Sequence, residues 1–335
     1  MRRHRARLAD VAEAAGVSMS TASKAINGRG RISAATRRRI LDSARELGFV
    51  ASSGPGRQPV TSVGVLAADL ESRFSLPILD GLEDGLSSSS SFVHLVNARG
   101  DRLRERHQLN ALLDRRVDGL IVVGGRTEER DPVGEDLPVP VVYVHSRSRD
   151  PRDASLVVDD AQGGRLQVEH LAALGRTRVA HLSGRPQYRV AADRKVGVAE
   201  AAEALGLHLV AELADGPRTA LWGRAAMLRV LESVGRDGVD AVVCDSDAIA
   251  LGVIDLLRRE SLRVPEDVAV VGYENFAPLV WNSDPAITSV DMLLEEMGRE
   301  AARRLHGALA GGGLEPGVVA MPCELVPRGS TTPGL

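Results

Sequence analysis

The chain has 335 residues, of which 44% are hydrophobic, and its formal net charge is −3. This length predicts two or three domains, because a single hydrophobic core seldom serves more than ~250–300 residues. No apolar run is long enough to span a membrane, and the basic start of the chain lacks the apolar segment of a secretory signal. Cys244 and Cys323 lie far apart without metal-ligand spacing, which predicts reduced thiols, no metal site and a cytoplasmic protein.

Charge is distributed unevenly along the chain. Residues 1–60 contain twelve Lys and Arg against four Asp and Glu, a net charge of +8, so residues 61–335 carry −11. Lysine and arginine displace counterions from phosphates, so a basic head on an acidic body predicts a polyanionic partner for the head. A solvated charged terminus would explain the arginines before residue 8, but not the positive charge that continues beyond them.

Residues 8–27 (LADVAEAAGVSMSTASKAIN) predict two short helices joined by a tight turn. The apolar residues of the first helix recur at helical spacing: Leu8, Val11, Ala12 and Ala15. Gly16 permits a positive φ at the turn, and Ser18 is a suitable N-cap for a second helix over Met19–Asn27. Small residues allow the two helices to cross closely, as in a DNA-binding helix-turn-helix. Any αα-hairpin of a helical domain would show the same pattern.

A third helix is predicted from the N-cap Ser33 to about Leu47, with Gly48 as its stop. Ile40, Ala44 and Leu47 mark its buried face. Three arginines, at positions 37, 38 and 39, crowd its first half, and we expect them to contact phosphates together with the arginines of the preceding loop. Three helices in about forty residues predict a small bundle.

The head carries a specific motif, L-x-D-V-A-x-x-A-G-V-S-x-x-T-x-S-x-x-x-N followed by R-I-S-x-x-T-R-R-R-I. It closely resembles the head domain of the LacI-type (lactose repressor) family of bacterial transcription regulators, whose second helix enters the major groove. The resemblance implies that Met19, Ser20 and Lys24 face bases, where Lys24 would donate to guanine and Met19 would either touch a thymine methyl or pack. The remaining predicted DNA-binding residues would contact phosphates or cap helices: Ser18, Thr21, Asn27, Arg31, Ser33 and Arg37.

Residues 51–61 (ASSGPGRQPVT) depart from the family pattern. The family follows its head with a hinge helix whose leucine wedges into the minor groove. This segment has no leucine, and Gly54, Pro55, Gly56 and Pro59 oppose a helix. We therefore expect a flexible linker and an operator that is bent little. A circular-permutation gel that reveals a sharp central kink would contradict this expectation.

From residue 62 the pattern changes to alternating strands and helices, which predicts α/β units with a parallel sheet and helices on both faces. Strands are expected at 62–67, 92–96, 119–123, 139–144, 178–182, 241–244, 268–271, 318–321 and 325–326. Helices are expected at 76–86, 102–115, 162–174, 191–205, 220–234, 249–260 and 293–309. The expected fold is a three-helix head (1–50), the linker and a body (62–335) of two doubly wound parallel sheets. One lobe takes about 62–160 and 291–321, and the other takes 161–290 and 322–335.

The body also carries R-V-D-G-L-I-V, V-E-H-L-A-A-L-G-R and R-V-P-E-D-V-A-V-V-G-Y. These stretches resemble the LacI-type effector domain, which is similar to periplasmic sugar-binding proteins, and imply a ligand site between the lobes at the carboxyl ends of strands. The residues implied for the effector are Asp69, Phe74, Arg194, Trp222, Ser246 and Glu274. The stacking aromatic is left open among Trp222, Trp281, Tyr188 and Phe276. Each polar residue alone could be an ordinary loop group.

Arg218 stands where the family commonly has an aromatic residue. Together with Arg194 it favours an anionic ligand such as a sugar phosphate or a sugar acid, although a neutral sugar remains possible. The resemblance implies a repressor that binds near-palindromic operator DNA as a homodimer and is controlled by a sugar-like effector. The tetramer-forming final segment of the lactose repressor is not found, which favours a dimer.

An enzyme is not expected. The chain has no P-loop and no G-x-G-x-x-G that follows a strand and opens a helix. Ser246 between two aspartates has no histidine in a recognisable position to serve as its base. No cofactor is implied. A transported-sugar-binding protein would not carry the basic head, and an architectural DNA-binding protein would not need the large body.

Overall fold

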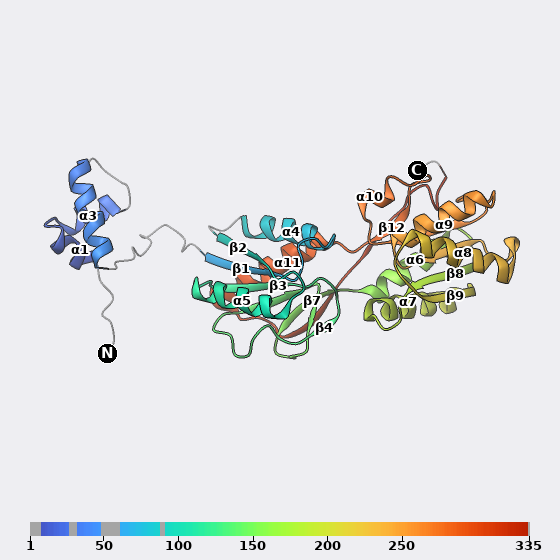
Figure 1. Cartoon of the computed structure of the whole chain (residues 1–335), viewed down its shortest axis with the longest axis horizontal. Coiled ribbons are helices and arrows are strands. Elements are labelled where there is room, and N and C mark those ends of the chain that lie inside the picture. The colour runs from blue at the N-terminus through green and yellow to red at the C-terminus, as the bar shows by residue number, and fades with distance from the viewer. Residues whose placement is uncertain (1–7, 27–31, 48–60, 88–90, 334–335) are drawn as a thin grey trace. The chain divides into compact units, whose positions relative to one another are not determined.

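The computed structural model describes residues 8–26, 32–47, 61–87 and 91–333 (Figure 1). The chain divides into two compact units, residues 1–59 and 60–335, which we call the head and the body. The predicted DNA contacts Asn27 and Arg31 lie outside the described residues, as does all of the predicted linker except Thr61. No helix in the described part of the chain is long and apolar enough to cross a membrane.

The head contains the three predicted helices, α1 (Leu8–Ala14), α2 (Met19–Ile26) and α3 (Ala34–Glu46). Gly16 adopts a φ of 61° between α1 and α2, as the turn requires. The buried side chains of the bundle are mostly small: Val11, Ala12, Ala15, Ala22, Ala25, Ile40 and Ala44. The prediction that Leu47 is buried was wrong, because Leu47 follows the last turn of α3 and is 41% exposed. Alanines let the helix axes approach closely, and burial of Ile40 alone contributes roughly 1.5–3 kcal/mol.

The first lobe of the body is built on a parallel sheet of order β13-β7-β5-β3-β1-β2. Its strands are β1 (Thr61–Ala67), β2 (Ser91–Asn97), β3 (Gly119–Val123), β5 (Val141–Val144), β7 (Ala154–Val158) and β13 (Gly317–Met321). Helices α4 (Ser75–Ser87) and α11 (Leu294–Gly307) share one core with the sheet, and α5 (Arg102–Asp114) packs in a separate core with β1 and β3. We call this part lobe 1.

Lobe 2 is built on a sheet of order β14-β12-β11-β10-β8-β9. Its strands are β8 (Arg178–Gly184), β9 (His208–Gly216), β10 (Ala241–Cys244), β11 (Ala269–Tyr273), β12 (Thr288–Asp291) and β14 (Glu324–Val326). Helices α6 (Asp160–Ala173) and α7 (Arg189–Leu205) pack in one core, and α8 (Ala220–Val234) and α9 (Asp247–Arg259) pack in another. The minor elements of the body are β4 (Glu129–Arg130), β6 (Arg147–Ser148), η1 (Arg236–Gly238), α10 (Ala277–Val280) and η2 (Ala308–Gly312).

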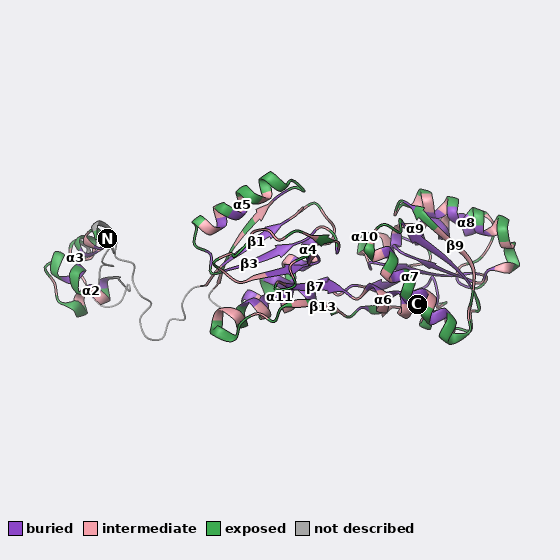
Figure 2. Ribbon diagram, turned by 90° about the horizontal axis from the view of Figure 1, so that it is seen from below, coloured by how far each residue is buried: buried purple, intermediate pink, exposed green. Residues whose placement is uncertain are grey.

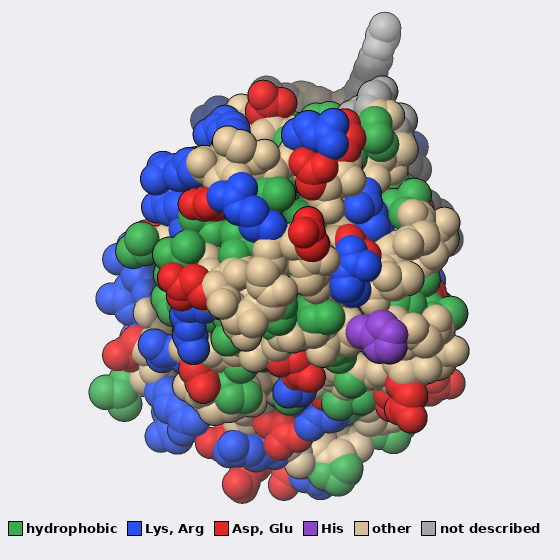
Figure 3. All heavy atoms as spheres, turned by 90° about the vertical axis from the view of Figure 1, so that its right-hand side faces the viewer, with side chains coloured by type: hydrophobic (Ala, Val, Ile, Leu, Met, Phe, Trp, Pro, Cys, Tyr) green, Lys and Arg blue, Asp and Glu red, His purple; other side chains and the backbone are tan. Residues whose placement is uncertain are grey.

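The chain passes between the lobes three times, after β7, after β12 and after β13. In Figure 2 the central strands of both sheets are buried, whereas the helices expose their outer faces. Figure 3 shows the body from the right-hand side of Figure 1, where basic and acidic side chains alternate over the surface as on an ordinary solvated face. This mixed surface contrasts with the strongly basic sequence of the head.

The predicted α/β class is confirmed, with one correction to the prediction of two parallel sheets. Strand β14 runs antiparallel to β12 at the edge of the second sheet. The predicted helix 220–234 and the predicted strands 119–123 and 241–244 agree with α8, β3 and β10 residue for residue. The prediction missed the main strands β7 and β9 and the four-residue strand β12. Strand β7 is a five-residue apolar run that periodicity cannot classify, and the edge strand β9 is half-exposed and carries alanine and glutamate.

Candidate nucleic-acid interface and effector pocket

Helix α2 exposes one face and buries the other. Ser18 caps it, because its Oγ accepts a hydrogen bond from the Thr21 amide at 3.2 Å and lies 2.8 Å from Thr21 Oγ1. Met19, Ser20 and Lys24 are exposed, and 57% of Met19 is accessible to solvent. Positions 19, 20 and 24 share one side of a helix, opposite the buried alanines. The head therefore presents an apolar, a hydroxyl and a cationic group together, the set that can read base edges.

The start of α3 is organised in the same way. Ser33 Oγ accepts from the Thr36 amide at 3.1 Å and lies 2.7 Å from Thr36 Oγ1. Arg37 is half-buried and Arg38 is exposed, so both remain open to phosphate contact. Arg39 instead donates from Nε to the carbonyl oxygen of Ala15 at 3.1 Å. Its charge-assisted bond ties α3 to the end of α1, a structural role that the sequence pattern did not indicate.

A cavity of about 370 Å³ lies between the two lobes of the body, at the carboxyl ends of strands. Lobe 1 contributes Phe74, which follows β1, and Gly125 and Arg126, which follow β3. Lobe 2 contributes residues that follow β8 or that end and follow β9: Arg185, Tyr188, Gly216, Pro217 and Arg218. We call this cavity the interlobe pocket. Two aromatic rings and three arginines give it both a stacking surface and positive charge.

The two lobes contact each other around the interlobe pocket. The guanidinium of Arg126 lies 5.1 Å from the ring centroid of Tyr188. Arg73 forms a close ion pair with Glu274. The amide of Arg189 donates to Glu128 Oε1 at 3.0 Å. A ligand in this pocket therefore occupies the place where the two lobes meet, and it can alter the way they contact each other.

Glu274 is a buried carboxylate in a left-handed backbone conformation, with a φ of 103°. Burial raises its pKa, although the charges of Arg73 and Arg218 oppose the shift. Arg218 Nη1 lies 3.9 Å from Glu274 Oε1, while Arg218 Nη2 is buried without a hydrogen-bond partner. Burial lowers the pKa of Arg218, with a further contribution from Arg194. The Glu274 carboxylate thus faces two arginines. It pairs closely with Arg73 and neutralises the charge of Arg218 only in part.

Arg194, implied by the resemblance to clamp the effector, is buried and engaged in lobe 2. Its Nε donates to Asp160 Oδ1 at 2.7 Å, and its Nη1 donates to the Asp245 carbonyl oxygen at 2.6 Å. The guanidinium also lies 3.5 Å from the ring centroid of Tyr273. Burial opposes the charge, but Asp160 and the other nearby acids raise the pKa of Arg194 above its usual value. The side chain stabilises the wall behind the pocket and is not part of its lining.

Four other predicted effector residues are also outside the lining: Asp69, Trp222, Ser246 and Glu274. Ser246 is fully buried and caps α9, accepting from the Ile249 amide at 3.3 Å. Asp69 Oδ1 accepts from the Glu71 amide at 3.0 Å in a local turn. Trp222 packs against Gly216, where a Cβ atom would overlap the indole ring. Trp222 therefore supports the pocket from behind, whereas Phe74 and Tyr188 supply its aromatic surface.

The sequence prediction missed Arg126 and Arg185. Arg185 follows β8 directly and Arg126 lies three residues after β3, and this position was the available signal. Neither arginine makes an ion pair within the part of the chain that the structure describes. The signal was insufficient because the two loops come from different lobes and meet only in the folded body.

A network of buried acids lies close to the pocket in lobe 2. Asp245 contacts His181 Nε2 at 3.1 Å and accepts from the Gly184 amide at 3.0 Å. Asp247 accepts from Ser289 Oγ at 2.5 Å and from the Phe276 amide at 2.8 Å. Burial nevertheless raises the pKa of Asp247 to about 7. Among the residues with described positions, no cluster of three His, Cys, Asp or Glu side chains is arranged to hold a metal ion.

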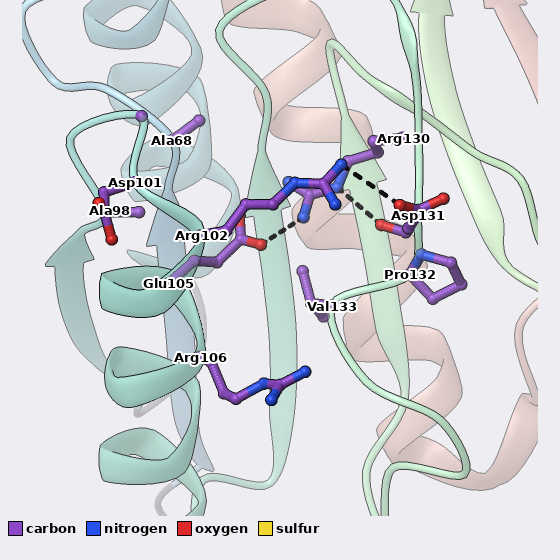
Figure 4. A pocket seen from close by; sticks show the side chains of 11 residues that line it. Ala68, Ala98, Asp101, Arg102, Glu105, Arg106, Arg130, Asp131, Pro132 and Val133 are labelled. Atoms are coloured by element: carbon purple, nitrogen blue, oxygen red, sulfur yellow. Dashed lines mark hydrogen bonds and ion pairs between the residues drawn. The ribbon is translucent and has the colours of Figure 1, made fainter.

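A second cavity, of about 410 Å³, lies within lobe 1 at the start of α5 (Figure 4). Two of its three arginines pair with acids of the lining. Arg130 contacts Glu105 at 2.6 Å, and Arg102 contacts Asp131 at 3.3 Å. Asp101 caps α5 by accepting from the Arg104 amide at 2.7 Å. Acidic and basic groups are balanced here, in contrast to the three arginines of the interlobe pocket.

The fold and the site define a DNA-binding head joined to a ligand-binding body. The family described as "Bacterial regulatory proteins, lacI family" matches residues 7–52, and "Periplasmic binding protein-like domain" matches residues 168–331. The HTH-type transcriptional regulator CelR of Thermobifida fusca is 33% identical and covers 98% of this chain and 99% of its own length. The chain belongs to the lacI family of bacterial regulatory proteins and is a DNA-binding transcriptional regulator.

Solved structures agree with this assignment. A complex of the transcriptional regulator CelR with cellobiose matches with a TM-score of 0.66 and 30% identity, over 97% of this chain and 100% of that chain. A lac repressor dimer bound to operator and the anti-inducer ONPF matches with a TM-score of 0.67 and 26% identity, over 98% and 99%. Catabolite control protein A of Priestia megaterium is 29% identical over 96% of this chain and 98% of its own length. These relatives are regulators and repressors of transcription.

Proposed function

We propose that this regulator is a repressor that binds near-palindromic operator DNA as a homodimer, in the cytoplasm, and that a sugar-like effector in the interlobe pocket controls its affinity. The observation that carries this proposal is the pocket itself, which takes its lining from both lobes. A ligand there contacts both lobes, and movement of one lobe against the other is the arrangement needed for allosteric control.

On the operator, α2 is proposed to enter the major groove. Lys24 donates to O6 and N7 of guanine, Ser20 bonds a base edge, and Met19 contacts a thymine methyl. The exposure of all three side chains supports this assignment. The positively charged head supplies the phosphate contacts that hold α2 in register, with Arg37 among them.

Dimerisation is proposed to cover the edge strand β2. This strand is paired on one side only, with β1. Its apolar residues Phe92, Val93 and Leu95 are exposed, Phe92 to 67%. An uncovered apolar edge strand invites pairing with another chain, and a second copy of the body is the partner that a near-palindrome requires. The lac repressor structure that matches this chain is a dimer on its operator.

For the effector, a sugar is supported by the aromatic surface of Phe74 and Tyr188 and by the cellobiose that CelR binds in its solved complex. The contacts Arg73–Glu274 and Arg126–Tyr188 cross between the lobes beside the pocket. A bound sugar would replace or reinforce them, move one lobe against the other and change the spacing of the paired heads.

The test is a binding screen with the full chain. Operator fragments are selected from random DNA, and their affinity is measured by fluorescence anisotropy with and without sugars and sugar derivatives. We expect a selected near-palindrome, a protein dimer on it, and at least one sugar that changes the affinity. DNA binding that is indifferent to every sugar tested, or selection of asymmetric sites by a monomer, would contradict the proposal.

A further inference from the structure

The interlobe pocket has an excess of positive charge. Its lining includes Arg126, Arg185 and Arg218 and contains no carboxylate. In the structure as described, Arg126 and Arg185 form no ion pair; Arg126 makes only its contact with the Tyr188 ring. Three guanidinium groups around about 370 Å³, with no carboxylate in the lining, create a positive potential that attracts an anion.

Arg218 is the central group of this arrangement. Its Nη2 is buried and has no hydrogen-bond partner, and 26% of its side chain is accessible. The nearest acid, Glu274, lies 3.9 Å from Nη1 and is already held in a close ion pair by Arg73. A buried donor without an acceptor is costly, and it persists where a ligand supplies the acceptor.

We propose that the effector of this chain is an anionic saccharide, a sugar that carries a phosphate or carboxylate group. The anionic group binds against Arg218, and Arg185 and Arg126 complete its binding site. Guanidinium groups bind such anions by paired, charge-assisted hydrogen bonds. The sugar ring lies against Phe74 and Tyr188. A neutral disaccharide would supply no negative charge to Arg126 and Arg185, and Arg218 would keep only its 3.9 Å contact with Glu274. This inference rests on the proposed function, because it specifies the ligand of the same pocket.

The experiment uses the full chain and two kinds of probe. Inorganic phosphate and acetate are compared with chloride at constant ionic strength, which tests the anion site without assuming a sugar. Glucose, glucuronate and glucose 6-phosphate then form a matched series that differs in one charged group and separates carboxylate from phosphate. Binding is read as the thermal shift of the unfolding midpoint as each probe is titrated.

Arg218→Gln is the test variant, and Arg229→Gln is its control. Arg229 is exposed on α8, so its substitution removes the same charge outside the pocket. Folding of both variants is checked by operator binding. We expect a saturable shift with phosphate or carboxylate probes, a requirement for at least tenfold more anion in Arg218→Gln, and unchanged titration in Arg229→Gln. The charged sugars should bind at least tenfold more tightly than glucose.

Anions that shift the midpoint no more than chloride does, or that bind Arg218→Gln as tightly as the wild type, would overturn the inference. Neutral sugars that change operator affinity while charged ones do not would also overturn it and would leave the proposed function intact. If no sugar of either kind changes operator affinity, the proposed function fails, and the phosphate and acetate titrations still decide whether the anion site exists.

Discussion

We propose that base recognition by the head depends most on one side chain, Lys24. It is exposed on α2 beside Met19 and Ser20, and it is the cation among the three. A lysine over a guanine edge specifies sequence, whereas a lysine over a phosphate only adds affinity.

Lys24→Ala should therefore weaken binding to the selected operator more than binding to random DNA. A lost base contact costs about 1–3 kcal/mol, which is about 5- to 150-fold in specific affinity. The measurement is anisotropy with both DNAs at one salt concentration. Arg38→Ala, on the exposed side of α3, is the control and should weaken both DNAs to a similar degree. Equal losses for Lys24→Ala would make Lys24 a phosphate contact.

Asp247 gives lobe 2 a pH dependence. Its pKa is raised to about 7 by burial, so the folded protein retains a proton that the unfolded chain releases near pH 4. The folded state binds more protons between these values, and stability therefore falls as pH rises from about 4 to about 7. The contribution of this group is on the order of 4 kcal/mol at most.

Asp247→Asn should flatten this part of the stability profile, because an amide does not ionise. Urea unfolding of the wild type and the variant at pH 5 and pH 7.5 measures the effect. We expect the wild type to gain more unfolding free energy at pH 5, relative to pH 7.5, than the variant does. An identical pH dependence would show that Asp247 titrates normally.

At the scale of elements, the crossing of α4 and α11 depends on glycine. A Cβ atom at Gly298 would overlap the backbone carbonyl of Ile78, so the two helices approach closer than any side chain permits. The same helix ends at Gly307, where a Cβ atom meets nothing within 4 Å.

Gly298→Ala should destabilise the body by about 1–3 kcal/mol or more, through overpacking at the crossing. Gly307→Ala is the matched control and should be neutral or stabilise by up to about 1 kcal/mol, since alanine is the better helix former. Chemical denaturation measures both variants. Equal stability of the two would mean that α4 and α11 can separate without cost.

Some elements of the fold can be predicted from the sequence and others cannot. Long amphipathic helices such as α8 and buried central strands such as β3 are predictable, because their apolar pattern is local. Strand β7 was missed because its pattern is short. At the site, Phe74 could be predicted from its position after β1, but the engagement of Arg194 by Asp160 could not, because it depends on side-chain contacts between α7 and α6. Arg126 and Arg185 become neighbours of one pocket only when the lobes meet.

At the scale of the whole molecule, assembly and control are linked. The proposed dimer covers β2, and without it two heads could not read adjacent half-sites. Phe92→Glu places a charge on the apolar edge and should shift the protein to monomers, with a loss of at least tenfold in operator affinity. Sedimentation measures the oligomeric state. Leu103→Glu, at a residue that is 80% exposed on α5, should leave the dimer intact. A Phe92→Glu dimer would place the interface elsewhere.

The central claim is that the pocket between the lobes and the operator-binding head are coupled. The most direct measurement is the operator dissociation constant, determined by anisotropy with and without a saturating amount of the saccharide that most raises the unfolding midpoint. We predict a change of about 5- to 150-fold in operator affinity, and an equal change in saccharide affinity when operator is bound, because coupling is reciprocal. Operator affinity that is the same with the pocket empty and full would contradict it.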